Sequence, residues 1–171
     1  MDTRHLVDPA LLPFLEVFPA LDVSPEGLAG ARAVVALFEP ENHGAADGLA
    51  VAVEQRMIDG PQGAASLLVL RPQGAAKRTR GGILHVHGGG YVIGRPEMSL
   101  PLLRATVAAH DCVIVTVDYR LAPEATWREA TEDGHAALVW MAGQAQALGV
   151  DPARIGVMGE SAGGGLAAAI A

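Results

Sequence analysis

Apolar positions along the chain follow two patterns, which change near residue 45. In residues 1–45, short apolar groups are separated by prolines. Asp8-Pro9 and Ser24-Pro25 each predict a helix start, because a side chain that can cap the helix precedes a proline at the first helical position. The polar, turn-rich stretch 39–44 predicts a linker. We therefore treat residues 1–45 as helices and a linker, and residues 46–171 as a separate core.

From residue 49 onward, strand-like and helix-like patterns alternate. Strands are predicted over 49–58, 65–70, 82–87, 112–117 and 154–158, helices over 99–110 and 126–148, and a small-residue helix after Gly159. The apolar, β-branched run 112–117 is typical of a strand covered on both faces. Thr126 and Glu129 have the spacing of a capping box. A strand pair followed by this alternation predicts an α/β fold, with a mostly parallel sheet of about five strands and helices on both faces.

Charge and composition narrow the possible partners. The formal net charge of −7 disfavours nucleic acid, which requires a basic stripe, and disfavours an anionic membrane surface. No apolar run approaches the roughly 20 residues that span a bilayer, and residues 1–5 lack the pattern of a signal peptide. The single cysteine, Cys112, cannot form an internal disulfide. We expect a cytoplasmic protein in which Cys112 is a small buried hydrophobe.

Gly159-Glu160-Ser161-Ala162-Gly163 fits the G-x-S-x-G nucleophile elbow between a predicted strand and a predicted helix. The serine of an elbow takes a strained conformation in a very tight turn, and side chains two residues before and after it collide unless both are glycine. The turn holds the hydroxyl clear of the sheet, beside the next backbone N–H and the helix N-terminus. Ser161 is therefore a candidate nucleophile.

The residues of this motif also fit two other structural patterns. In a chain with 21 glycines, the motif can be a Gly-rich turn without chemistry. Residues 163–168 also satisfy G-x-G-x-x-A, a dinucleotide-binding fingerprint. However, its first glycine falls several residues after the strand, and no acidic residue follows at the required distance. No group of His, Cys and Asp has metal-ligand spacing, so we expect neither a metal nor an organic cofactor.

His87-Gly88-Gly89-Gly90-Tyr91 is a second motif, placed at the end of the predicted strand 82–87. Acyl transfer builds negative charge on an oxygen, which needs two or three N–H donors fixed in advance. Consecutive glycines let backbone N–H groups turn toward one point. An elbow and a glycine loop, in this order and both at strand ends, indicate acyl transfer more specifically than either motif alone.

These two motifs, together with the block Tyr119-Arg120-Leu121-Ala122-Pro123-Glu124, resemble the signature blocks of the hormone-sensitive-lipase-like (bacterial family IV) esterases of the α/β-hydrolase superfamily. The resemblance extends over nearly the whole chain. It implies the sheet order 1-2-4-3-5, and cap helices within residues 1–45 that roof an acyl pocket. It also implies that Ser161 is the nucleophile, that the N–H groups of Gly89, Gly90 and Ala162 form the oxyanion hole, and that His87 and Gly88 support the oxyanion loop.

The chain departs from the family pattern in two places. Most members have aspartate before the nucleophile, where this chain has Glu160; the change keeps a hydrogen-bond acceptor. After Glu124, a stretch beginning Thr126-Trp127 replaces a Pro-Phe-Pro-Ala-like sequence. Because the capping box restores the helix start, we expect only a local change there.

The rest of the catalytic triad poses a separate question. Such hydrolases order the triad as serine, then Asp or Glu, then histidine, but only ten residues follow Ser161 and none is acidic or histidine. No upstream histidine has a positional reason to meet the serine. The strand 154–158 would also form an open apolar edge. We therefore expect the chain to be the N-terminal half of the fold, completed by a second polypeptide that supplies further strands, the acid and the histidine.

The function predicted for the completed protein is hydrolysis of carboxylic esters with short to medium acyl chains, through an acyl-enzyme. Two alternatives are kept: a non-catalytic homologue that binds small molecules, and an inactive fragment. The sequence does not name the physiological ester.

Overall fold

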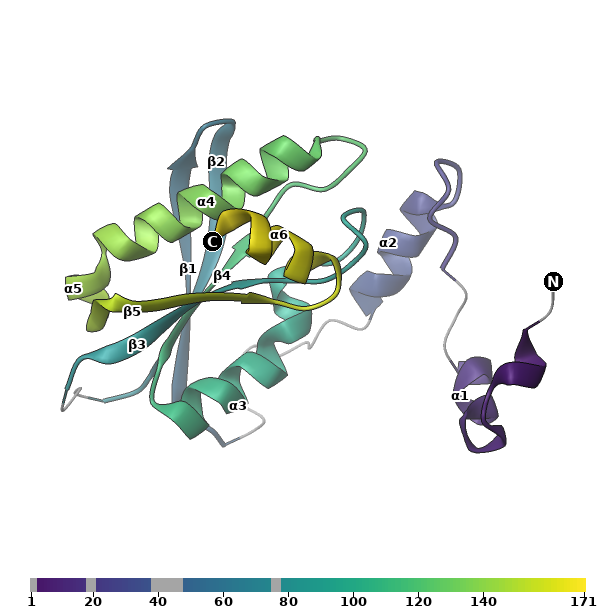
Figure 1. Cartoon of the computed structure of the whole chain (residues 1–171), viewed down its shortest axis with the longest axis horizontal. Helices are drawn as coiled ribbons and strands as arrows, with labels where there is room; N and C mark the ends of the chain where they lie inside the picture. The colour runs from purple at the N-terminus through teal and green to yellow at the C-terminus, as the bar shows by residue number, and fades with distance from the viewer. Residues whose placement is uncertain (1–2, 18–20, 38–47, 75–77) are drawn as a thin grey trace.

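The structure is a computed structural model of the whole chain, and it describes residues 3–17, 21–37, 48–74 and 78–171 (Figure 1). The predicted linker 39–44 lies outside the described residues. The elements are η1 (Arg4–Leu6), η2 (Pro9–Leu11), α1 (Leu12–Val17), α2 (Leu28–Leu37), β1 (Val51–Gly60), β2 (Gly63–Pro72), β3 (Arg80–Val86), η3 (Pro96–Ser99), α3 (Leu100–His110), β4 (Val113–Asp118), α4 (Trp127–Gly143), α5 (Ala145–Leu148), β5 (Val150–Gly159) and α6 (Ala162–Ile170).

The five strands form one mixed sheet in the order β1-β2-β4-β3-β5, which confirms the predicted order. β1 and β2 form an antiparallel hairpin, and β2 is also antiparallel to β4. β4, β3 and β5 are parallel to one another. Since β3 and β5 run in the same direction, the loops that follow them meet at one end of the sheet, which contains both predicted motifs.

Apolar side chains on successive residues of the central strands point to opposite faces and build two cores. On one face, Leu67 and Val69 of β2 pack beneath α4, α5 and α6. On the other face, Leu68 and Leu70 pack against α3. β4 contributes Val113, Val115 and Val117 to the first core and Ile114 to the second. The covered faces explain why β4 is apolar throughout, as the sequence predicts.

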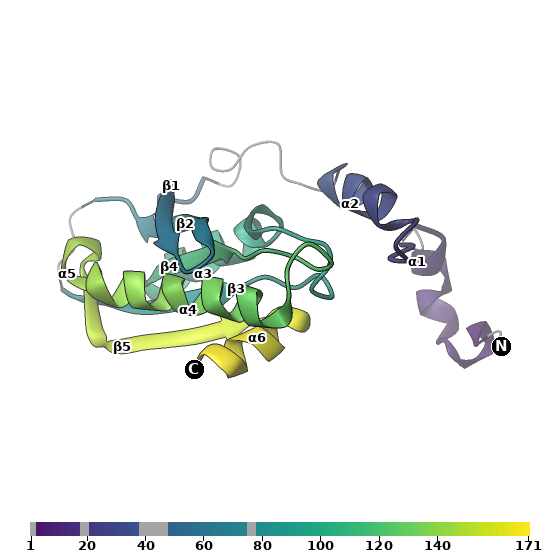
Figure 2. The same cartoon turned by 90° about the horizontal axis from the view of Figure 1, so that it is seen from above.

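The helices lie in the layers that an α/β hydrolase requires. α4 and α6 lie side by side on one face of the sheet, and α3 covers the other (Figure 2). α2 lies beyond the end of the sheet where β3 and β5 finish, and α1 lies farther out (Figures 1 and 2). The division at residue 45 and the roof over an acyl pocket stay predictions.

Three elements differ from the sequence predictions by more than a shift of two residues at an end. The helix predicted over 126–148 is interrupted at Gln144, which separates α4 from α5. Ser24 caps a turn, in which its hydroxyl accepts the N–H of Gly27, and α2 begins only at Leu28. β5 begins at Val150 and not at 154, because an irregularity in its pairing with β3 accommodates residues 151–154. Proline is tolerated at such a bulge, so Pro152 does not end the strand.

The start of α4 agrees with its sequence signal. The Thr126 hydroxyl accepts the N–H of Glu129 at 3.4 Å, and the Glu129 carboxylate accepts the N–H of Thr126 at 2.7 Å. This reciprocal pair is the predicted capping box. It fixes the chain between the Tyr119–Glu124 block and α4, and so restores the helix start where the sequence departs from the pattern of the family that it resembles.

Candidate active site

Ser161 lies at the junction of β5 and α6 in the backbone conformation that an elbow demands. Its φ of 53° and ψ of −123° are rare for a residue with a side chain, and it is the N-cap of α6. The two flanking glycines are required by contact. A Cβ on Gly159 would lie 2.4 Å from the Gly163 carbonyl oxygen, and one on Gly163 would lie 2.2 Å from the Val86 carbonyl oxygen. The Ser161 side chain is exposed.

The glycine loop after β3 lies against this elbow. A Cβ on Gly88 would lie 3.5 Å from the Cβ of Ser161, so the two segments are in contact. Gly89 and Gly90 have φ of 128° and 61°, a region that favours glycine. Within the described part of the chain, none of the N–H groups of Gly89, Gly90 and Ala162 donates to another residue. Three backbone donors near Ser161 are therefore available to a ligand.

Glu160 joins the glycine loop to the elbow. Its Oε1 accepts the N–H of Gly88 at 3.1 Å and the hydroxyl of Ser99 at 3.0 Å. Its Oε2 lies 2.8 Å from Nε2 of the buried His85, whose Nδ1 lies 2.8 Å from the hydroxyl of Thr116. Burial works against the charge of Glu160, but the Gly88 N–H and His85 outweigh it, and the pKa of this carboxyl is lowered.

The protonation of His85 follows from its two partners. An ionised Glu160 only accepts hydrogen bonds, so Nε2 of His85 carries the proton and Nδ1 accepts the hydrogen bond from Thr116. Burial lowers the pKa of His85, and the nearby Glu160 carboxylate offsets only part of this effect. The folded protein therefore holds a neutral His85 next to a charged Glu160.

This arrangement predicts the titration of His85. A depressed pKa gives stability that is present above the unfolded-state value of about 6.5 and is lost as the pH falls toward the folded-state value. We expect the titration midpoint of His85 to lie below the value of about 6.5 for free histidine, with the neutral ring as its Nε2–H tautomer. Long-range ¹H–¹⁵N NMR of the imidazole between pH 4 and 8 measures this. A midpoint at or above 6.5 would contradict the assignment.

His87 supports the loop from beneath. Its Nδ1 lies 2.7 Å from the Gly88 carbonyl oxygen, and its ring stacks on Tyr119 at 4.3 Å between centroids. The Tyr119 hydroxyl donates to the His87 carbonyl oxygen at 3.0 Å. Burial lowers the pKa of His87, so its ring is neutral, with Nδ1 donating to Gly88. Nε2 of His87 is buried and has no partner among the described residues.

The structure does not bring a histidine to Ser161 among the residues it describes. His85 and His87 have the partners given above, and no hydrogen bond joins either ring to the serine hydroxyl. His5 lies in η1, and His110 is the last residue of α3. His135 lies on α4, and His43 falls outside the described residues. A general base supplied from elsewhere stays a prediction.

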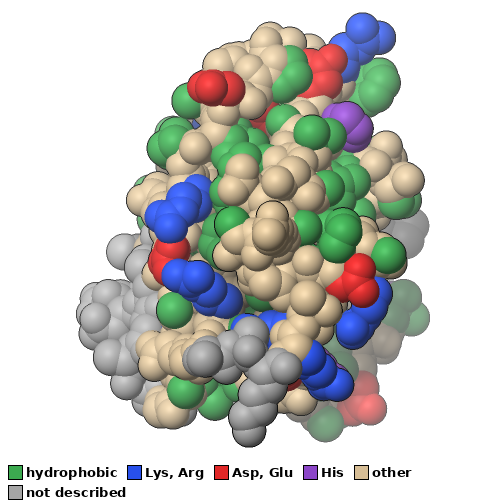
Figure 3. All heavy atoms as spheres, turned by 90° about the vertical axis from the view of Figure 1, so that its left-hand side faces the viewer, with side chains coloured by type: hydrophobic (Ala, Val, Ile, Leu, Met, Phe, Trp, Pro, Cys, Tyr) green, Lys and Arg blue, Asp and Glu red, His purple; other side chains and the backbone are tan. Residues whose placement is uncertain are grey.

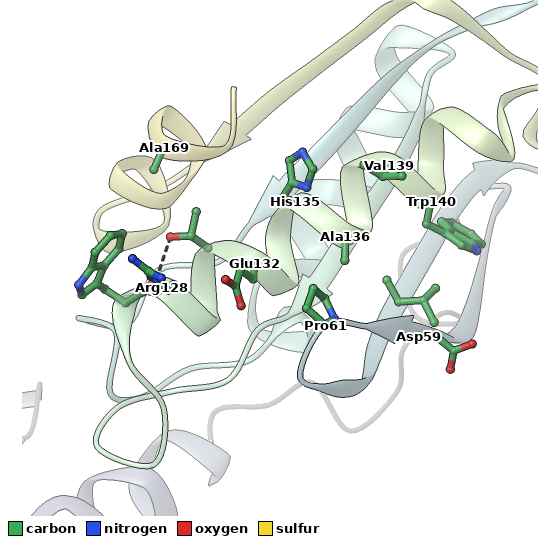
Figure 4. A pocket seen from close by; sticks show the side chains of 12 residues that line it. Asp59, Pro61, Arg128, Glu132, His135, Ala136, Val139, Trp140 and Ala169 are labelled. Carbon is green, nitrogen blue, oxygen red and sulfur yellow. Dashed lines mark hydrogen bonds between the residues drawn. The ribbon is translucent and has the colours of Figure 1, made fainter.

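A large apolar groove lies away from this site. It has a volume of about 850 Å³ and is lined by residues of the β1–β2 hairpin, α4 and the end of α6, among them Pro61, His135, Val139, Trp140 and Ala169 (Figure 4). None of the elbow or glycine-loop residues lines it. We therefore do not assign this groove to the chemistry of Ser161.

The described surface gives little indication of other partners. At the end of the sheet where β3 and β5 begin, basic side chains are interspersed with acidic ones (Figure 3). Across the described ranges, no three side chains of metal-ligating type come together. In the same part of the chain, none of the helices is both long and apolar enough to cross a bilayer.

Sequence reasoning missed several residues of this site. His85, Thr116 and Ser99 all belong to the network around Glu160, although Ser99 stands at the N-cap position of α3. The Ser99 hydroxyl makes no capping bond and donates to Glu160 instead. The only signal in the sequence was Glu160 itself, which stands where most family members have aspartate.

Comparison with known proteins agrees with this geometry. Residues 83–171 match the family model described as alpha/beta hydrolase fold. Esterase LipI of Mycobacterium tuberculosis is 33% identical over 99% of this chain and 52% of that protein. Rabbit (Oryctolagus cuniculus) arylacetamide deacetylase is 44% identical over 58% of this chain and 26% of that protein. The solved structure of a bacterial heroin esterase superposes with a TM-score of 0.85 at 32% identity, covering 99% of this chain and 53% of that one. The chain thus spans about half the length of Esterase LipI and of the heroin esterase, which it matches over nearly all of its own length.

Proposed function

Because this chain belongs to the α/β-hydrolase family, among the hormone-sensitive-lipase-like esterases, we propose that it carries the nucleophile and the oxyanion hole of a serine carboxylesterase. The substrates we propose are esters with short to medium acyl chains. The observation that carries this proposal is the strained, exposed Ser161 beside three backbone N–H groups that have no partner among the described residues.

The chemistry follows the order of bond changes in acyl transfer. The Ser161 Oγ attacks the ester carbonyl carbon and gives its proton to a general base. The carbonyl oxygen becomes an oxyanion, which accepts hydrogen bonds from the N–H groups of Gly89, Gly90 and Ala162. The C–O bond to the alcohol then breaks, and the alcohol takes the proton from the base. Water, activated by the same base, attacks the acyl-enzyme and releases the acid and Ser161.

The general base and its acid are proposed to come from outside these 171 residues. Two observations support this: no described histidine is bonded to Ser161, and the full-length relatives are about twice as long. β5 pairs with β3 alone among the described strands, so its other edge is free to accept a further strand. We call this chain together with the polypeptide that supplies the acid and histidine the completed enzyme.

Purification and assay of the completed enzyme test the proposal. A tagged copy of the chain, isolated from its own cells, is expected to bring down sequence of the C-terminal half of an α/β hydrolase and to release nitrophenol from p-nitrophenyl butyrate. A monomeric, stable chain without such sequence would contradict the proposed partner. Binding of ester analogues without any nitrophenol release by the completed enzyme would favour the binding homologue over the enzyme.

A further inference from the structure

Arg32 joins helix α2 to two loops that flank the candidate site. Its Nε donates to the Val92 carbonyl oxygen at 2.9 Å, and its Nη2 donates to the Ala122 carbonyl oxygen at 2.9 Å. Its Nη1 and Nη2 each donate to one carboxylate oxygen of Glu124 at 2.8 Å. These partners lie 60 to 92 residues away along the chain. One side chain therefore connects three segments that are distant in sequence.

The two carbonyl groups that Arg32 binds belong to Val92 and Ala122, whose own N–H groups donate to the segment Gly89–Tyr91. The N–H groups of Val92 and Ile93 both donate to the Gly89 carbonyl oxygen, at 3.1 and 3.0 Å. The N–H of Ala122 donates to the Tyr91 carbonyl oxygen at 2.9 Å. The Arg32 guanidinium binds the carbonyl oxygens of both Val92 and Ala122. It therefore connects the two loops that the Ala122–Tyr91 hydrogen bond also joins. Arg32 thus binds, on the α2 side, the same residues whose N–H groups contact the Gly89 and Tyr91 carbonyl oxygens.

Arginine is suited to this position because its planar guanidinium carries five N–H donors in a fixed arrangement, whereas lysine offers a single rotatable charge. The hydrogen bonds from Arg32 lower the pKa of Glu124 to about 2, so the carboxylate remains charged at neutral and mildly acidic pH. The Glu124 side chain is 62% exposed, and an exposed ion pair contributes little by itself. The bonds to the two backbone carbonyls are therefore the ones that position the loop.

α2 is held in place by more than its arginine. Leu28, Ala31 and Val35 lie on one side of the helix and are buried. A small cavity lined by Arg32, Val35, Ala36, Gly94, Arg95 and Leu121 lies between the helix and the loops. Because this packing remains when the guanidinium is removed, a change of Arg32 tests the hydrogen bonds without removing the apolar contacts of α2.

We propose that Arg32 is a positioning residue for the oxyanion hole, which holds the Gly89–Val92 turn in shape through the Val92 and Ala122 carbonyls. This inference rests on the proposed function, since it assigns the loop a catalytic task. Helix α2 is then part of the active-site framework as well as of the predicted cap.

Amide hydrogen exchange on the completed enzyme, measured without any ester, tests the positioning. In Arg32→Ala, the N–H groups of Val92, Ile93 and Ala122 are expected to exchange about tenfold faster or more, since they belong to the turn that loses its support. Amides in the centre of the sheet, such as Val115, are expected to keep their rates. Arg128→Ala, an exposed arginine on α4, is the matched control and leaves all four unchanged. Unchanged exchange at the three loop amides in Arg32→Ala would overturn the proposal.

Kinetics on the completed enzyme test the catalytic consequence. Arg32→Ala is expected to lower kcat for p-nitrophenyl butyrate by about tenfold or more with KM changed little, since misplaced donors weaken mainly transition-state binding. Glu124→Gln keeps both carbonyl bonds and is expected to stay within about threefold of the unmodified kcat. Faster loop exchange with unchanged kcat in Arg32→Ala would overturn the role of Arg32. Faster exchange in a protein without esterase activity in any form would instead refute the proposed function.

Discussion

Replacing Ser161 with alanine is expected to lower kcat/KM of the completed enzyme for p-nitrophenyl butyrate on the order of 10³-fold or more, because the variant cannot form an acyl-enzyme. The exposed hydroxyl makes no hydrogen bond to another described residue, so its removal breaks no contact there. We therefore expect the melting temperature to change little. Initial rates of nitrophenol release at several ester concentrations measure the effect.

A second serine provides the control for this substitution. Ser66 lies on β2, three strands away from β5 in the sheet order, and its hydroxyl accepts a hydrogen bond from Gln55 at 3.0 Å. Ser66→Ala is expected to keep the rate within about twofold, as surface substitutions usually do. Hydrolysis by Ser161→Ala at a rate close to that of Ser66→Ala would refute Ser161 as nucleophile.

Gly163→Ala is expected to destabilise the chain by about 3 kcal/mol, the upper part of the usual range for overpacking. The added Cβ would lie 2.2 Å from the Val86 carbonyl oxygen and 2.4 Å from that of His87. Both atoms belong to the backbone at the end of β3, so they cannot move aside without displacing the start of the glycine loop. For a domain of this size, the melting temperature falls by roughly 6–12 °C, as measured by circular dichroism.

Gly156 supplies the matched control, since it also belongs to this part of the chain. It lies within β5, and a Cβ placed on it would meet no atom within 4 Å. Gly156→Ala is expected to leave the melting temperature unchanged or to raise it slightly, because alanine loses less backbone entropy in a strand. Equal melting temperatures for the two variants would show that α6 does not pack closely on the end of β3.

Local signals in the sequence were sufficient for most of the fold. The apolar run 112–117 predicted a strand covered on both faces, and Thr126 with Glu129 predicted the start of α4. The strand order came from the family resemblance, since pairing across a sheet is not encoded locally. The break at Gln144 follows Gly143, the last residue of α4, and the prediction of one helix over 126–148 did not use this glycine. The extension of β5 over Pro152 depends on its irregular pairing with β3, which exists only in the folded chain.

In the candidate site, too, the sequence predicts some residues and not others. The motifs containing Ser161 and Gly88 can be recognised in the sequence from the spacing of their glycines, because tight turns restrict which residues fit. The supporting residues cannot. His85, Ser99 and Arg32 reach their partners over 60 to 92 residues of sequence, and each is an ordinary polar residue in its own segment. Only three-dimensional contact shows that they hold the glycine loop.

Covalent trapping tests the central claim, that Ser161 is the nucleophile, most directly. The completed enzyme is treated with diethyl p-nitrophenyl phosphate, which transfers a diethylphosphoryl group to an activated serine and releases nitrophenolate. Peptide mass spectrometry then locates the group among the four serines of the chain, Ser24, Ser66, Ser99 and Ser161. We expect one phosphoryl group per chain, on Ser161, and a loss of ester hydrolysis in proportion to the fraction of Ser161 that is modified. Loss of hydrolysis with Ser161 unmodified would contradict the claim.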